Sequence, residues 1–209
     1  MNKKNFIVFE GGEGSGKTTA MNQCAEYLRA KGMTVVTTHE PGGTKLGQKI
    51  RALLLETYST PIFSQTELLL FLADRAQHVQ EFILPHLQQG AVVLCDRFTG
   101  STLAYQIGAR GLAPAELITA MEQYARQNLE PELVLYLDVD PMIGIARKQI
   151  QKEVIMNRLD KEKMEFHAKV RAYFLELSKT QPHWVTIDSH RPMPDVHQEV
   201  LTHITHLFK

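Results

Sequence analysis

The amino-acid sequence predicts an α/β fold, in which helices pack on the faces of a doubly wound, five-stranded parallel sheet. Three observations predict this fold class. Five short apolar segments alternate with longer stretches of helical periodicity. The first segment, 6–10, is continuously apolar up to its last residue, as expected for a strand that is buried on both faces. A glycine-rich loop then separates this strand from the first helical stretch, which opens a βαβ unit.

The five strands are expected at residues 6–10, 33–38, 91–95, 133–137 and 184–187. The helix between the first two strands is expected to end at Gly32, because glycine suits the left-handed position after a helix. Ser64 and Glu67 form a capping-box pattern at the start of a long helix, which Pro85 is expected to kink or shorten. No linker, repeat or low-complexity tract interrupts the chain, so residues 1–209 are expected to form one domain.

The glycine-rich loop carries the strongest functional signal. Its residues at 11–18, G-G-E-G-S-G-K-T, match the G-x-x-x-x-G-K-[ST] pattern between a strand and a helix. Glycines let the backbone turn with positive φ and bring several N–H groups around phosphate oxygens. Lys17 can reach the outer phosphates and the Thr18 hydroxyl can bind Mg²⁺. A plain glycine turn would leave both side chains unexplained, so we expect a nucleotide phosphate site of the P-loop type.

Composition and charge limit the classes of partner. The 23 Lys and Arg residues balance the 23 Asp and Glu residues, so no nucleic-acid partner is expected, because non-specific nucleic-acid binding usually needs a basic excess. Cys24 and Cys95 lie far apart in a helical and a strand pattern, which indicates buried thiols in a reducing compartment. The chain shows no signal peptide and no apolar run that could span a membrane, so a cytoplasmic protein without a membrane partner is expected.

Polar residues follow three of the expected strands, at the edge where an open parallel sheet binds its ligands. They lie at 10–18, 39–44 and 96–97. Asp96 ends an apolar strand, a position that suits a carboxylate for Mg²⁺ beside a phosphate loop. A solvated strand end paired with Arg97 is the simpler alternative.

A second nucleotide site is indicated by an aromatic ring and a guanidinium group one helical turn apart, at Phe71 and Arg75. The ring can stack on a base and the guanidinium can bind a phosphate. The simpler alternative is a core phenylalanine beside a surface ion pair. We prefer the second site because Arg97 and Arg110 come from other segments and are expected to converge on the same anion.

Five motifs occur in the order and spacing of one known family. They are F-E-G-G-E-G-S-G-K-T-T from residue 9, E-P-G-G-T at 40–44, F-L-A-D-R-A-Q-H at 71–78, D-R-F at 96–98 and A-Y-Q at 104–106. On these motifs the chain resembles thymidylate kinase essentially from end to end. The resemblance implies a P-loop NTPase-type fold of the nucleoside-monophosphate-kinase kind, which transfers the γ-phosphoryl group of ATP to dTMP in dTTP biosynthesis. It also implies Mg²⁺ as the cofactor and a homodimer.

The same resemblance implies which residues bind each substrate. ATP is implied to contact Gly11, Gly12, Glu13, Gly14, Ser15, Gly16, Lys17, Thr18, Thr19 and Arg147, the last against adenine. dTMP is implied to contact Glu13, Phe71, Arg75, Arg97, Ser101, Thr102, Tyr105 and Gln106. The implied catalytic residues are Lys17, Asp96, Arg97 and Arg158, and the implied metal ligands are Thr18 and Asp96.

Individual roles in the dTMP site are also implied by the resemblance. Glu13 is implied to accept a hydrogen bond from the 3′-hydroxyl of the sugar, and Phe71 to stack on thymine. Arg75 and Gln106 are implied to contact the edge of the base. Tyr105 is implied to occupy the place of a ribose 2′-hydroxyl, which favours deoxyribose.

A short lid is implied at about 147–158. Some family members carry a basic residue at the loop position that is Gly14 here, whereas the bacterial type supplies this cation from the lid. Arg158 is the preferred candidate to reach the transferring phosphoryl group, and Lys148 and Lys152 are interpreted as solvated charges.

The chain departs from the family pattern at His39, where arginine is common, and at Asn157, where aspartate is common. Three alternative functions stay open. Another nucleoside or nucleotide kinase would use the same scaffold with a different acceptor. A P-loop switch protein would bind GTP, but the sequence lacks the Asn-Lys-x-Asp motif that reads guanine; a motor or clamp-loader ATPase subunit would need a longer chain.

Overall fold

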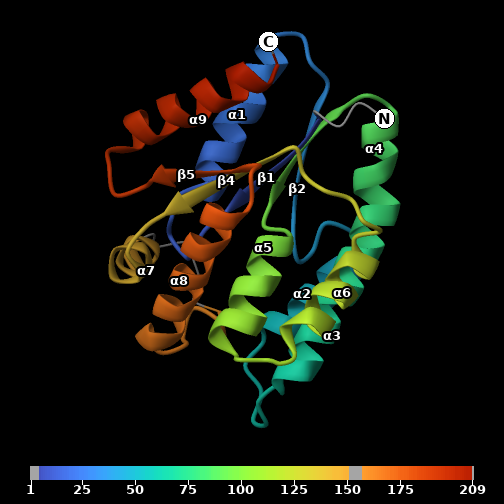
Figure 1. The fold of residues 1–209 in the computed structure, drawn as a ribbon, viewed down its shortest axis with the longest axis vertical. Helices are drawn as coiled ribbons and strands as arrows, with labels where there is room; N and C mark the ends of the chain where they lie inside the picture. Colours follow the sequence, from blue (N-terminus) through green and yellow to red (C-terminus); the bar gives the residue numbers. More distant parts are fainter. Residues whose placement is uncertain (1–4, 151–156, 209) are drawn as a thin grey trace.

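The computed structural model describes residues 5–150 and 157–208, and this part of the chain contains one sheet whose strand pairs are all parallel (Figure 1). Its strands are β1 (Phe6–Glu10), β2 (Val35–His39), β3 (Val92–Asp96), β4 (Leu133–Asp138) and β5 (Trp184–Asp188). They lie in the order β2-β3-β1-β4-β5, which places β1 at the centre of the sheet. The expected α/β class with five parallel strands is confirmed.

Four strands run one residue beyond the end that their apolar pattern predicts. The additional residues are His39 in β2, Asp96 in β3, Asp138 in β4 and Asp188 in β5. The pairing continues through them, since His39 pairs with Asp96 and Asp138 with Asp188. The parallel ladders therefore bring polar side chains to the carboxyl edge of the sheet, where ligands of such folds bind.

Helices cover both faces of the sheet: α1 and α9 pack on one face, and α5 and α8 on the other (Figure 1). The helical elements are α1 (Lys17–Ala30), α2 (Lys45–Leu55), α3 (Ser64–His78), the π-helical turn η2 (Val79–Ile83), α4 (Leu84–Gln88), α5 (Thr99–Thr102), the π-helical segment η3 (Leu103–Ala109), α6 (Ala115–Ala125), α7 (Pro141–Ile150), α8 (Met164–Thr180) and α9 (Met193–Leu207). None of the helices in the described ranges is long and apolar enough to cross a membrane.

The central strand contributes to two hydrophobic clusters, because successive side chains of a strand point to opposite faces. Ile7 and Phe9 pack in the cluster that includes α1 and α9. Phe6 and Val8 pack on the other face with Val79 of η2. These four side chains of β1 are almost fully buried, which explains why the strand is continuously apolar from Phe6 to Phe9.

The long helix expected from Ser64 is formed by α3, η2 and α4 in succession. The wider π turn lies directly before the turn of Pro85, whose nitrogen has no hydrogen to donate to the preceding turn. The predicted capping box is wrong: Phe63 is the residue at the N-cap, and no side chain caps the helix there. Glu67 is instead almost fully buried, and its carboxylate binds side chains from other segments.

Candidate active site

The phosphate loop joins β1 to α1, and its glycines are required by close packing as well as by backbone conformation. Gly14 and Gly16 have φ angles of 65° and 88°, in the left-handed region that favours glycine. A Cβ atom on Gly14 would lie only 1.9 Å from the carbonyl oxygen of Gly144 in α7. No side chain fits at position 14 in this arrangement, so the loop itself cannot supply a cation there.

The first turn of α1 holds Lys17 and Thr18 beside the end of β3. The Lys17 ammonium donates to the carbonyl oxygen of Gly12 at 2.8 Å. Burial, together with the charge of Arg97, lowers the pKa of Lys17 to about 8. The Thr18 hydroxyl donates to Oδ2 of Asp96 at 2.5 Å. The two side chains that were predicted as metal ligands therefore meet at the carboxyl edge of the sheet.

The other residues of the predicted ATP set lie around this loop. Ser15 is buried, and its carbonyl oxygen accepts a hydrogen bond from the Ser189 hydroxyl at 2.6 Å. Thr19 is exposed on the first turn of α1. Arg147 of α7 donates to the carbonyl oxygen of Ser189 at 2.8 Å, so α7 and the segment after β5 approach the loop together.

A cavity of about 120 Å³ lies beside the phosphate loop. All eight residues that were predicted to contact dTMP line it: Glu13, Phe71, Arg75, Arg97, Ser101, Thr102, Tyr105 and Gln106. The remaining lining residues are Glu40, Pro41, Arg51, Leu55, Lys148, Asn157 and Leu159. Segments that are far apart in the sequence thus form one chamber with aromatic, acidic and basic walls.

Glu13 connects the phosphate loop to this cavity. Its Oε1 accepts hydrogen bonds from Arg97 at 2.7 Å and from the Tyr105 hydroxyl at 3.1 Å, and its Oε2 accepts one from Lys148 at 3.0 Å. Burial opposes ionisation of Glu13, but the charges of Arg97, Lys17 and Lys148 outweigh it and hold the pKa well below its usual range. The backbone of Arg97 has φ of 70°, a conformation that non-glycine residues rarely adopt and that often marks a functional site.

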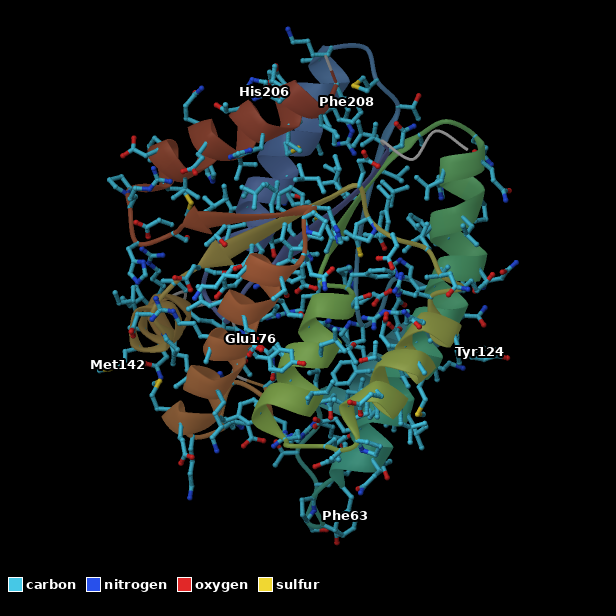
Figure 2. The ribbon with its side chains drawn as sticks, in the orientation of Figure 1. Phe63, Tyr124, Met142, Glu176, His206 and Phe208 are labelled. Atoms are coloured by element: carbon cyan, nitrogen blue, oxygen red, sulfur yellow. The ribbon has the colours of Figure 1, made fainter. Side chains whose placement is uncertain are left out.

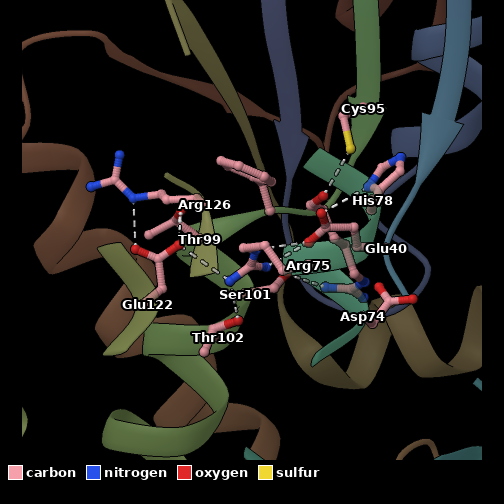
Figure 3. A network of polar contacts seen from close by, with 12 residues as sticks. Glu40, Asp74, Arg75, His78, Cys95, Thr99, Ser101, Thr102, Glu122 and Arg126 are labelled. Carbon is pink, nitrogen blue, oxygen red and sulfur yellow. Dashed lines mark hydrogen bonds and ion pairs between the residues drawn. The ribbon is translucent and has the colours of Figure 1, made fainter. Parts of the chain in front are cut away.

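Arg75 lies at the centre of a buried ionic network (Figure 3). Its Nε and Nη2 donate to one oxygen of Glu40 at 2.9 and 2.7 Å, and its Nη1 donates to Thr102 at 2.8 Å and to Glu122 at 3.3 Å. The other Glu40 oxygen lies 2.8 Å from Nδ1 of His78. The alternative of a surface ion pair is therefore wrong, because Arg75 is only 2% exposed.

Arg110 does not join the other two arginines. It donates to Glu67 at 3.1 Å and pairs with Glu162 at 2.7 Å, and it does not line the cavity. Of the three guanidinium groups that were expected to converge on one anion, only those of Arg75 and Arg97 line the cavity. The available carboxylates of Glu67 and Glu162 hold the third guanidinium elsewhere.

Lys148 is not a solvated charge, so this interpretation is wrong. Its ammonium lies 3.0 Å from Oε2 of Glu13 and 2.5 Å from Oδ1 of Asp160, and its side chain lines the cavity. Lys148 directly follows Arg147 in α7, and this pair of adjacent cations gave no sign that one of them enters the cavity. Only the packing of α7 against the phosphate loop brings Lys148 to the substrate side.

Arg158, the preferred lid cation, is held away from the cavity. Its Nη2 pairs with Glu67, and its Nε donates to the carbonyl oxygen of Leu54 at 3.0 Å. Lys152 lies outside the described residues, as does the rest of the predicted lid at 151–156.

Arg51 and Glu40 are two charged residues of the cavity wall to which the sequence analysis gave no role. Arg51 reaches the cavity from α2 and donates to the carbonyl oxygen of Pro41 at 2.8 Å. It follows the buried Ile50 in an ordinary amphipathic pattern, so no local signal distinguished it. Glu40 stood in a quoted motif, but its role as the counter-ion of Arg75 depends on a contact between residues 35 positions apart.

The carboxyl edge of the parallel sheet holds a phosphate loop and, beside it, the hydroxyl–carboxylate pair of Thr18 and Asp96. A cationic cavity adjoins them. This arrangement defines a P-loop phosphotransferase with two substrate sites. The family model described as "Thymidylate kinase" matches residues 9–200. The chain therefore belongs to the thymidylate kinase family.

Curated relatives agree with this assignment. The thymidylate kinase of Protochlamydia amoebophila is 49% identical over 203 residues, which cover 94% of this chain and 90% of the relative. The thymidylate kinase of Acaryochloris marina is 44% identical, with 93% of each chain covered. That of Geobacillus thermodenitrificans is 44% identical, with 94% of this chain and 87% of the relative covered. These matches over most of the chain exclude two alternative functions, the GTP-binding switch protein and the motor or clamp-loader subunit.

Proposed function

We propose that this chain binds ATP at the phosphate loop and dTMP in the adjacent cavity, and transfers the γ-phosphoryl group of ATP to give ADP and dTDP. The chain is an ATP-dependent kinase of dTMP by its membership of the family over residues 9–200. The position of Glu13 carries the structural side of the proposal, because this loop residue projects its carboxylate into the cavity beside Arg97. Two nucleotides bound on either side of Glu13 would meet with their phosphates end to end.

Phosphoryl transfer depends mainly on alignment of the phosphates and on neutralisation of their charge. The loop amides and Lys17 hold the phosphates of ATP, and Arg97 binds the acceptor phosphate of dTMP. Glu13 accepts the hydrogen bond of the 3′-hydroxyl, and Phe71 stacks on the base. Tyr105 closes the wall at the sugar, so that a ribose would find no room for its second hydroxyl.

Thr18 and Asp96 are the residues we propose to hold Mg²⁺. A hydroxyl and a carboxylate oxygen that lie 2.5 Å apart fit a hard cation that also takes oxygen ligands from phosphates and water. Bound there, the ion would neutralise charge that develops on the phosphate oxygens. The chain's own contribution is to keep both oxygen ligands beside the first turn of α1 through this hydrogen bond.

We also propose a single domain over 1–209 with a lid at about 147–158 that supplies a cation for the transferring group. Within the lid, Lys148 is better supported in this role than Arg158. Lys148 lines the cavity and contacts Glu13, whereas Arg158 would first have to leave its contacts with Glu67. A lid cation can contribute on the order of 10³ to 10⁵ in rate.

The turnover of dTMP, dUMP, dCMP, AMP and thymidine, each measured with ATP and Mg²⁺, tests the reaction and distinguishes this chain from other nucleotide kinases. We expect dTMP to have the highest kcat/KM; a preference for thymidine itself would contradict phosphorylation of a monophosphate. Lys17→Ala is expected to abolish turnover with the fold intact, because the buried ammonium at the loop is lost. Lys179→Ala, which removes an exposed lysine at the end of α8, is the matched control and is expected to leave turnover unchanged.

A homodimer is the proposed assembly. Its support is a set of exposed apolar side chains on the neighbouring helices α2, α3 and α6, namely Leu53, Leu69, Leu117 and Tyr124. Light scattering of the parent protein is expected to give twice the chain mass. Leu69→Glu is expected to lower this mass, whereas Met142→Glu on α7, across the molecule from Tyr124 (Figure 2), is expected to leave it unchanged. A monomeric parent protein would contradict the proposal.

A cytoplasmic location is proposed on the basis of the two cysteines. Cys24 and Cys95 are both buried and free, as expected for a protein in a reducing compartment.

A further inference from the structure

Glu67 is a buried carboxylate that connects the cavity to two segments outside it. It lies in the first turn of α3 and is only 1% exposed. Its Oε1 accepts hydrogen bonds from the Gln106 side-chain amide at 2.8 Å and from Arg110 at 3.1 Å, and its Oε2 accepts from Arg110 at 3.2 Å and from Arg158. The reaction described above assigns no role to this residue.

The charge state of Glu67 determines which end of the Gln106 amide it can bind. Burial alone would favour the neutral acid, but hydrogen bonds from Arg110, Gln106 and Arg158 outweigh burial and lower the pKa of Glu67. An ionised carboxylate only accepts hydrogen bonds, so its partner on Gln106 has to be the NH₂ group. The carbonyl oxygen of that amide must then point elsewhere.

This carbonyl oxygen, Oε1 of Gln106, is buried and has no hydrogen-bond partner among the described residues. Buried polar atoms are nearly always paired in folded proteins, so an exception in the wall of a cavity indicates an atom that awaits a ligand. Gln106 lines the substrate cavity together with Phe71 and Arg75. A residue of the cavity wall therefore carries a buried acceptor whose hydrogen bond is left unmade.

Arg75, which lines the same cavity, retains one hydrogen-bond donor. Its contacts to Glu40, Thr102 and Glu122 use Nε, both hydrogens of Nη1 and one of Nη2, which leaves one N–H of Nη2 within the described contacts. A base that offers a ring N–H to Gln106 and a carbonyl oxygen to Arg75 satisfies both walls. Thymine has this pattern. Cytosine instead has an acceptor at the ring nitrogen, which would face the acceptor of Gln106, and an amino group, which would face the donor of Arg75.

We propose that Glu67 is a positioning residue that fixes the amide orientation of Gln106 and thereby makes the cavity select thymine over cytosine. The proposal rests on the assignment of dTMP as the acceptor substrate. Glu67 acts without touching the nucleotide: it holds the NH₂ group of Gln106, and the oxygen on the other side of the same amide reads the base. A site with fixed hydrogen-bonding groups can reject a mismatched analogue by about 10⁴-fold.

Glu67→Gln is the decisive variant, because glutamine can donate as well as accept and leaves the Gln106 amide free to turn. The ratio of kcat/KM for dTMP to that for dCMP is expected to fall about 100-fold, and the ratio of their dissociation constants, measured by calorimetry without ATP, is expected to fall with it. Arg110→Gln is the matched control. It removes two bonds to Glu67 but keeps the carboxylate, so both ratios are expected to stay within about threefold of the parent values.

The double variant Glu67→Gln/Gln106→Glu provides the rescue. It exchanges the two groups, so that the side chain facing the cavity has acceptor oxygens only, and the preference for dTMP is expected to return. A purely structural role of Glu67 predicts no such recovery. If Glu67→Gln does not fold, as judged by circular dichroism, the double variant decides: preference for dTMP supports the proposal, and loss of preference in a folded protein overturns it.

Two failures are distinguishable. A folded Glu67→Gln protein that keeps the parent ratio overturns the role of Glu67 and leaves the kinase assignment intact. A parent protein that neither binds nor phosphorylates dTMP overturns the kinase assignment itself.

Discussion

Asp74 lies beside the buried Arg75 network, and its burial makes the stability of the protein depend on pH in an unusual direction. The side chain is 1% exposed; Oδ1 accepts a hydrogen bond from the Gly42 backbone at 3.0 Å, whereas Oδ2 has no partner among the described residues (Figure 3). Burial, with the nearby charge of Glu40, raises the pKa of Asp74 from 3.8 to about 6. The folded state therefore binds a proton at this position more tightly than the unfolded chain does.

The sign and size of the effect follow from this difference in pKa. Because the folded pKa is the higher one, the favourable contribution of Asp74 is complete below pH 3.8 and is lost as the pH rises through about 6. A shift of about two units corresponds to about 3 kcal/mol at pH 8. Asp74→Asn keeps the acceptor for Gly42 and removes the charge, so it is expected to stabilise the protein by about 3 kcal/mol at pH 8 and by only about 1 kcal/mol near pH 4.5.

Urea denaturation of the parent protein and of Asp74→Asn at both pH values measures these differences. Asp188→Asn is the control of opposite sign. Hydrogen bonds from His190 lower the pKa of the exposed Asp188, so this variant is expected to lose a little stability at pH 8. Equal gains for Asp74→Asn at the two pH values, or a loss at pH 8, would refute the account of Asp74 as a carboxylate that burial penalises.

Three further predictions concern the site. Glu40→Gln leaves Arg75 buried without its main counter-ion, so the thermal midpoint is expected to fall by about 6 to 12 °C in calorimetry. Glu165→Gln, in an exposed pair with Lys169, is expected to shift the midpoint by less than about 2 °C, and similar shifts for the two variants would contradict the importance of burial. Arg97→Ala is expected to raise the KM for dTMP about 100-fold with a smaller change in the KM for ATP, and unchanged dTMP kinetics would remove its role. Lys148→Met is expected to lower kcat about 10³-fold and Arg158→Met less than tenfold in steady-state assays; the reverse order would return the catalytic role to Arg158.

The fold was predictable because five short, mainly apolar segments alternate with helical stretches and because the first loop has a specific spacing. These are local signals, and they located the five strands to within two residues at either end. The same kind of reasoning failed at Ser64 and Glu67, where a local pattern suggested a cap. Glu67 is a buried carboxylate that accepts hydrogen bonds from three distant side chains instead of from its own helix end. Those partners cannot be read from the sequence near Glu67.

In the candidate site, too, some residues could be predicted from local signals and others depend on tertiary packing. Lys17, Thr18 and Asp96 could be predicted from residue type and position at strand ends, and all of the residues predicted for dTMP line one cavity. Lys148 could not be predicted, because a lysine in a charged segment is usually solvated and only the approach of α7 to the loop changes its surroundings. The roles of these residues in binding and catalysis stay predictions until the variants are measured.

The contact between Gly14 and Gly144 has a consequence for how this enzyme can change during evolution. A Cβ atom on Gly144 would lie 2.1 Å from the carbonyl oxygen of Glu13, so neither glycine tolerates a methyl group while the other segment stays in place. A mutation that introduced arginine into the loop would displace α7 and, with it, the lysine that lines the substrate chamber. A lineage with this architecture can therefore move its cation from one segment to the other only by rebuilding both together.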